Sequence, residues 1–113
     1  MKYKQNAISD PQPSMNIEGV DGYLGDTFVS DSKDKTICAG FFHLNKTDKP
    51  LVYTYDYEEM KVIVEGEFII SDESGYKVHA KVGDVLYFGD GETIIFETPS
   101  RGVGFFAGQR QPL

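Results

Sequence analysis

Few residues in this chain have types that could do chemistry. Its only histidines are His43 and His79, and its only cysteine is Cys38. One cysteine excludes an internal disulfide and any multi-cysteine metal site, and its apolar neighbours favour a buried, unreactive thiol. A lone histidine is more often structural than functional. We keep His43, in an apolar segment, as a candidate ligand-binding residue, whereas flanking lysines place His79 on a solvent face.

Glu59 and Lys61 are two residues apart, so a regular strand would present both side chains on one face. There the Lys61 ammonium could neutralise the Glu59 carboxylate. Such a pair could move a proton and stabilise developing negative charge on a substrate. The alternative is an ion pair at a strand end with no chemical role.

Length and composition limit the classes of protein. A chain of 113 residues with 40% hydrophobic residues is one globular domain. A net charge of −7 disfavours partners such as nucleic acid and anionic membrane, which attract clustered cations. No apolar run is long enough to span a membrane, and no apolar segment follows the first residues. We therefore expect a cytoplasmic protein.

The elements that would position these residues are mostly strands. Pro11 and Pro13 exclude a helix in their segment, and we expect residues 1–35 to form an extended N-terminal arm with edge strands. Apolar and β-branched runs predict strands at 36–44, 51–55, 60–64, 67–71, 76–81, 85–88, 93–98 and 103–107. Turn residues separate these runs, and none has a helical period. Residues 36–113 are thus predicted to form a small all-β barrel or sandwich.

Glu59 precedes Gly66 with six residues between them. This spacing matches the end of the first cupin motif, and residues 36–107 resemble the cupin superfamily. The closer resemblance is to the small EutQ-type cupins, named after an ethanolamine-utilisation protein, and residues 38–41, 57–67 and 81–88 carry it. The resemblance implies a single RmlC-like jelly-roll β-barrel, and says little about substrate because function lies in the site rather than the fold.

The resemblance also places non-ligating residues at the usual metal positions. Tyr53 and Tyr55 stand at the two histidine positions of the first motif, and Ile94 and Thr98 at the histidine and asparagine positions of the second. Isoleucine offers no donor atom, and a phenol binds divalent metals poorly at neutral pH because its pKa is near 10. We therefore expect no metal cofactor. A divalent metal held by Glu59 and the two tyrosines is the alternative.

In this resemblance Glu59 points into the barrel, with Lys61 and Tyr55 completing a candidate catalytic set. Glu59 would move a proton, Tyr55 would orient or polarise a carbonyl, and Lys61 would supply positive charge. The candidate ligand-binding residues are Tyr53, Tyr55, Tyr57, His43, Ile94, Phe96 and Thr98. A barrel packed solid by the same rings is the alternative.

Two functions from different classes follow. The first is a metal-independent isomerase, lyase or cyclase acting on a small polar metabolite. The second is a non-catalytic binding or accessory protein that uses the same pocket, and a divergent metal-dependent lyase or dioxygenase is a third. The acetate activation associated with EutQ is not carried over, because no phosphate-binding loop is present. Cupins commonly dimerise through such N-terminal strands, so the resemblance implies a homodimer.

Overall fold

The computed structural model describes residues 1–113, and its regular structure is almost entirely β. One short 3-10 helix, η1 (Ala7–Ser9), precedes the strands. The strands are β1 (Gly22–Val29), β2 (Cys38–Asn45), β3 (Leu51–Thr54), β4 (Glu59–Asp72), β5 (Lys77–Lys81), β6 (Val85–Phe88), β7 (Thr93–Glu97) and β8 (Arg101–Gly108). The all-β expectation is confirmed, and most predicted strands agree within two or three residues at each end.

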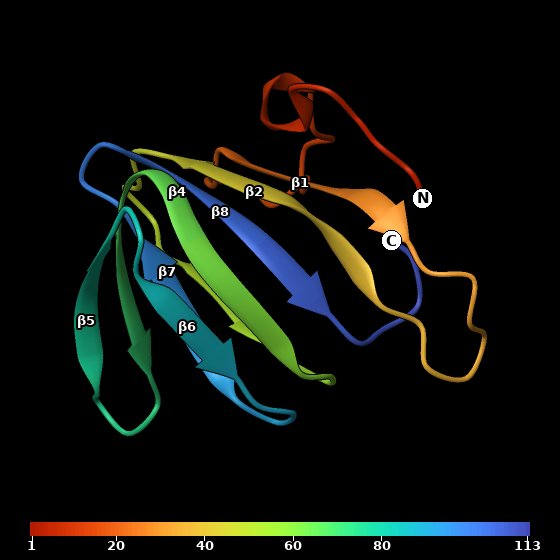
Figure 1. The fold of residues 1–113 in the computed structure, drawn as a ribbon. Coiled ribbons are helices and arrows are strands. Elements are labelled where there is room, and N and C mark those ends of the chain that lie inside the picture. The colour runs from red at the N-terminus through yellow and green to blue at the C-terminus, as the bar shows by residue number, and fades with distance from the viewer.

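The strands form one curled antiparallel sheet (Figure 1). Six of them follow the order β1-β2-β8-β4-β7-β3, and both β5 and β6 pair with β4. The first part of β4 pairs with β6 and β8, whereas its last part pairs with β5 and β7. The long β4 strand therefore joins the two halves of the barrel.

The predicted break between residues 64 and 67 is a bend within β4 rather than a gap between two strands. The pairing of β4 with β8 shifts register between Ile63 and Glu65. Gly66 then takes a φ of 66°, in the left-handed region that favours glycine. A Cβ at Gly66 would overlap the carbonyl oxygen of Arg101. A glycine is thus needed where β4 passes from one half of the barrel to the other.

Aromatic rings fill much of the barrel interior. Phe42 stacks on Phe68 with ring centroids 5.6 Å apart and meets Phe96 edge-on at 5.4 Å. Phe106 and Ile63 are also fully buried beside them. Rings of this size bury a large apolar area and prefer these offset or edge-on contacts. The inward face of β4 therefore packs against a core of closely packed aromatic rings.

The segment before β1 folds back along that strand. Met15 N donates a hydrogen bond to Gly22 O, and Leu24 N donates to Pro13 O. Figure 1 shows the N-terminal residues above β1 and β2. The extended N-terminal arm expected over residues 1–35 is not shown, whereas β1 (Gly22–Val29), within that range, is an edge strand of the sheet. The structure contains no helix with the length and apolar character needed to cross a membrane.

Candidate functional site

Three polar side chains meet inside the barrel, and we call Tyr55, Glu59 and Lys61 the interior polar cluster. Lys61 Nζ lies 3.4 Å from Glu59 Oε2, and Tyr55 OH donates a hydrogen bond of 2.7 Å to the same oxygen. Glu59 and Lys61 are each only 4% exposed. Their spacing in β4 places both on its inward face, as strand alternation requires. The carboxylate therefore faces a cation and a hydroxyl donor, shielded from bulk water.

Aromatic faces surround the ammonium group of Lys61. Its Nζ lies 4.5 Å from the ring centroid of Phe42, 4.7 Å from that of Phe96 and 5.6 Å from that of Phe88. Ring faces attract a cation, but they replace water poorly. Burial lowers the pKa of Lys61, and the charge of Glu59 opposes that shift only in part.

A small cavity adjoins this cluster. Its volume is about 30 Å³, which is room for roughly one or two water molecules. It lies where β1 and β3, the two ends of the strand order, approach each other, and we call it the seam cavity. Its lining residues are Met15, Leu24, Phe42, Leu51, Tyr53, Tyr55, Tyr57, Glu59, Lys61 and Phe96. The barrel is thus neither solid nor widely hollow at this point.

Three tyrosines form one wall of the seam cavity. The Tyr53 ring meets Tyr55 edge-on at 4.7 Å, and Tyr53 OH donates a 3.3 Å hydrogen bond to Tyr57 OH. Burial is the main cause that raises the pKa of Tyr55, and the Glu59 charge raises it further. Burial likewise raises the pKa of Tyr57, with the Tyr53 hydrogen bond adding to it. Tyr55 and Tyr57 therefore stay neutral at ordinary pH and serve as hydrogen-bonding hydroxyls.

The residues present do not fit a divalent metal at the usual cupin position. Ile94 provides no donor atom, and Tyr55 is held as a neutral phenol. The cationic Lys61 side chain stands against the carboxylate of Glu59, where it would repel a metal ion. No three His, Cys, Asp or Glu side chains gather anywhere in the chain.

The structure brings most of the predicted site residues together and separates the rest. Tyr53, Tyr55, Tyr57 and Phe96 line the seam cavity with Glu59 and Lys61. Ile94 is buried and pairs with Tyr53 across β3 and β7, but it lines a different hollow, beside β5 and β6. Thr98 lies beyond β7, where its N–H donates to Thr47 Oγ1 and its carbonyl accepts from Thr47 N. Thr98 therefore fastens a loop and differs in role from our expectation.

His43 also differs from the expectation that it lines the ligand pocket. Its neighbours Phe42 and Leu44 point into the core, so strand alternation turns His43 to the outer face of the sheet. There it lines a separate hollow with Glu65 and Arg101. Its Nε2 is buried without a hydrogen-bond partner, and burial lowers the pKa of His43. Its apolar strand neighbours could not fix this orientation from sequence.

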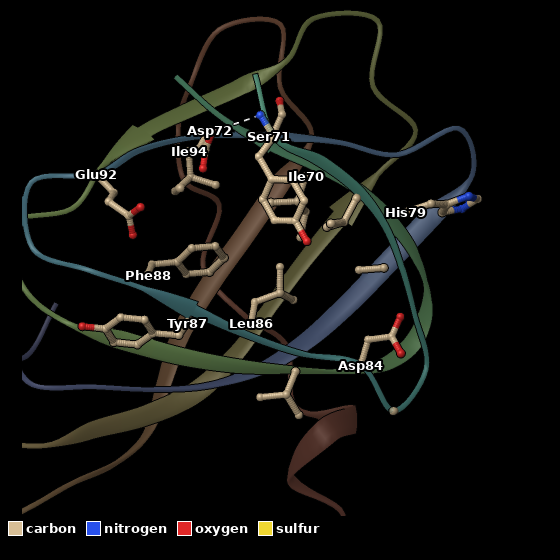
Figure 2. Close-up of a pocket in the computed structure, with 15 residues that line it drawn as sticks. Ile70, Ser71, Asp72, His79, Asp84, Leu86, Tyr87, Phe88, Glu92 and Ile94 are labelled. Carbon is tan, nitrogen blue, oxygen red and sulfur yellow. Dashed lines mark hydrogen bonds between the residues drawn. The ribbon is translucent and has the colours of Figure 1, made fainter. Parts of the chain in front are cut away.

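The other two candidate groups lie away from the cluster. His79 Nε2 lies 2.6 Å from Glu67 Oε1 at the surface, and Figure 2 shows the ring turned away from the interior. Cys38 is fully buried, its Sγ lies 3.3 Å from the Arg110 carbonyl oxygen, and burial raises the pKa of its thiol. Both positions agree with the structural roles expected for them.

A larger hollow, which sequence reasoning missed, opens beside β5 and β6. We call it the mouth hollow, and its volume is about 560 Å³. Figure 2 shows Ile70, Leu86, Phe88 and Ile94 across its floor and the carboxylates of Asp72, Asp84 and Glu92 around its edge. The Phe88 ring stacks on Tyr55 with centroids 5.0 Å apart, so it separates this hollow from the interior polar cluster.

Sequence reasoning also missed a buried ion pair beside the tyrosines. Arg110 donates to both carboxylate oxygens of Asp26, at 2.7 and 3.1 Å, and both side chains are 9% exposed. The guanidinium lies 5.6 Å from the ring centroid of Tyr57. These hydrogen bonds raise the pKa of Arg110 although burial opposes its charge. The partners are 84 residues apart, so no local pattern signals the pair.

The curled sheet and the inward-facing Glu59 define a cupin-type barrel. An RmlC-like cupin from Shewanella frigidimarina NCIMB 400 has the same fold, with a TM-score of 0.66 and 13% identity, over 96% of this chain and 93% of that one. This likeness concerns the fold alone. The class predicted from the motif residues is thereby confirmed.

Within this class, the family model described as "Ethanolamine utilisation protein EutQ" matches residues 12–106, and the chain belongs to this family. The EutQ protein of Clostridium difficile aligns with a TM-score of 0.72 and 18% identity, over 87% of this chain and 75% of that one. A curated Salmonella typhimurium LT2 protein named Acetate kinase EutQ is 32% identical over 72 residues. That match covers 64% of this chain but only 30% of the relative's length.

Proposed function

We propose that the protein binds a small polar metabolite at the seam cavity and that Glu59 moves a proton on it, in a metal-independent isomerase, lyase or cyclase reaction. The observation that carries the proposal is the interior polar cluster itself. A buried carboxylate and a buried amine cost free energy, and a hydrophobic pair of similar size would often be no less stable. Ionisable groups held in a cavity at such cost are candidates for chemistry.

The geometry suggests a role for each member of the cluster. Glu59 Oε2 lies within reach of both Tyr55 OH and Lys61 Nζ, so it is oriented as a proton acceptor and donor. Tyr55 and Tyr57 remain neutral hydroxyls. Tyr55 OH donates its hydrogen bond to Glu59 Oε2 and orients that carboxylate, whereas Tyr57 OH accepts from Tyr53 and could donate its own hydrogen bond to a substrate carbonyl. Lys61 would stabilise the negative charge that develops on the carbonyl oxygen as the proton leaves.

The experiment is a solvent-exchange assay with a panel of small hydroxy acids, keto acids and aldehydes in D₂O. Proton transfer at carbon predicts deuterium incorporation detected by NMR, and this should be lost in Glu59→Gln. Lys77→Met, on the surface of β5, is the matched control and should exchange at the wild-type rate. Equal exchange by Glu59→Gln and wild type would contradict the role of Glu59.

The second candidate function is binding without catalysis, and the mouth hollow favours it. An apolar floor with a few polar groups at the edge is the usual form of a small-ligand site. Val78→Gln would change this hollow without contacting Glu59. A ligand whose thermal stabilisation is lost in Val78→Gln and kept in Glu59→Gln would support this candidate over the first.

We also propose that the protein is cytoplasmic and forms a homodimer. Met60 and Val85 are 60% and 71% exposed, and they stand next to Tyr87 and Val62 across β4 and β6. Contiguous apolar residues on a sheet surface often mark an interface.

The curated relative is named Acetate kinase EutQ, but the match covers only 30% of its length. An assay of acetate-dependent ATP turnover by this protein tests whether that activity applies here.

A further inference from the structure

We infer that Lys61 is a nucleophilic amine whose Nζ condenses with a small aldehyde to form an imine inside the barrel. This inference rests on the proposed ligand site at the seam cavity, and it names the substrate class. It gives Lys61 a covalent role beyond the supply of positive charge.

The surroundings of Lys61 make its ammonium form easier to deprotonate than that of an exposed lysine, although the Glu59 carboxylate still pairs with it. An ammonium has three N–H donors, and Glu59 is the one charged partner that Lys61 has. The rings of Phe42, Phe88 and Phe96 surround the group and supply no acceptor oxygen. Desolvated lysines in apolar pockets are the ones that proteins use as nucleophiles.

A glycine on the neighbouring strand β8 leaves space for the Lys61 side chain. A Cβ at Gly104, on the neighbouring β8 strand, would lie 2.9 Å from Lys61 Cδ. The four-carbon stem therefore lies against bare backbone, and the reactive end reaches the seam cavity. Lys61 shares that cavity with Glu59 and Tyr55, so nucleophile, proton carrier and hydroxyl donor border one space.

The size of the space selects the carbonyl compound. A volume of about 30 Å³ admits roughly one or two waters, and so a carbonyl group with one or two carbons. Met15, Leu24 and Tyr53 are among the side chains that line the seam cavity. A benzaldehyde ring would have to displace these side chains, so the site should reject it.

The step balances without a co-reactant. The ammonium proton passes to Glu59 across 3.4 Å and leaves a neutral amine. The Nζ lone pair then bonds to the carbonyl carbon, and the π pair moves to oxygen, which takes the proton from Glu59. Glu59 then takes a proton from the nitrogen and gives it to the carbinolamine hydroxyl, which leaves as water. The nitrogen lone pair forms the C=N bond of a protonated imine, and Glu59 returns to its carboxylate form. No electron is gained or lost overall.

Reductive trapping of the full-length protein tests the inference. Acetaldehyde and cyanoborohydride near neutral pH would place an ethyl group on Lys61, located by peptide mass mapping. We expect alkylation there about tenfold faster than at the exposed Lys77, because the neutral amine is scarce at an ordinary lysine near pH 7. Benzaldehyde should label Lys77 and not Lys61. An unmodified Lys61 beside an ethylated Lys77 would overturn the inference. This comparison is made within the wild-type protein, so it does not depend on the folding of a variant.

Glu59→Gln separates the two proposals. It should slow trapping at Lys61 and leave Lys77 unaffected, and an unchanged rate at Lys61 would overturn the assigned proton transfer. A panel metabolite that exchanges deuterium through Glu59 while Lys61 stays unalkylated would refute the imine and leave the proposed function standing. An ethylated Lys61 with no exchange of any metabolite would support the imine and refute the proton-transfer function.

Discussion

Replacing Lys61 with methionine removes the cation that faces Glu59 while keeping the length of the side chain. Breaking a buried ion pair from one side typically costs about 3–5 kcal/mol, because the remaining charge is left in an apolar site. Tyr55 still donates its 2.7 Å hydrogen bond to Glu59, and methionine still packs among the rings. We therefore expect the lower end, about 3 kcal/mol of the free energy of unfolding. For a domain of this size that is a fall in Tm of roughly 12 °C.

The double variant Glu59→Gln with Lys61→Met removes both charges. Because a buried pair replaced as a whole is often neutral in stability, the double variant should unfold within about 1 kcal/mol of wild type. Glu59→Gln alone leaves Lys61 without its charged partner and should also cost about 3 kcal/mol. The coupling energy of the cycle would then be about 5 kcal/mol or more. Urea unfolding followed by far-UV circular dichroism measures all four proteins.

Lys77→Met is the control for losing a surface lysine and should change stability by less than about 0.5 kcal/mol. The reasoning is refuted if Lys61→Met loses no more than this control. It is also refuted if the two single effects simply add in the double variant. Either result would mean that Glu59 and Lys61 do not interact inside the barrel.

Four further predictions concern the fold and the site. Gly66→Ala should lower the free energy of unfolding, measured in urea, by about 3 kcal/mol. Gly75 also has a positive φ but has open space for a Cβ, so Gly75→Ala should cost only about 1 kcal/mol. Equal losses would refute the clash at Gly66. Because the folded pKa of Tyr55 is raised by burial, its contribution to stability is complete below pH 10 and is lost as pH rises above that value. Tyr55→Phe should therefore flatten the fall of the urea midpoint between about pH 9 and 11, and an unchanged slope would contradict this. Arg110→Lys should lose about 2 kcal/mol, since an ammonium cannot bind both oxygens of Asp26, and full stability would show the bidentate pair is dispensable. Dialysis against a chelator should leave Tm unchanged. A fall in Tm that is recovered on adding one metal would contradict the conclusion that these residues do not fit a divalent metal.

The sequence carries most of the information about the fold of this protein. Strand periodicity and turn residues locate the strands from β2 onward because each depends on a few neighbouring side chains. The bend in β4 is an exception. Glu65 and Gly66 resemble a turn in sequence, and only the backbone of Arg101 on β8 explains why a glycine continues the strand there.

The site is only partly predictable because it depends on contacts between distant residues. Motif spacing and strand alternation place Glu59, Lys61 and Tyr55 on one interior face. Alternation alone could not decide which face of β2 carries His43, since apolar residues flank it on both sides. The mouth hollow depends on how far β5 and β6 stand from β7, which is a matter of sheet curvature rather than composition.

NMR of protein labelled with ¹³C at lysine Cε tests the central claim most directly. The Lys61 signal, assigned by its loss in Lys61→Met, should titrate below the range of the other lysines because burial lowers its pKa. It should also move when a small aldehyde or another ligand from the panel is added. The contradicting result is a Lys61 signal that titrates with the surface lysines and whose chemical shift no added compound changes. It would show that the interior is neither desolvated at Lys61 nor a ligand-binding site.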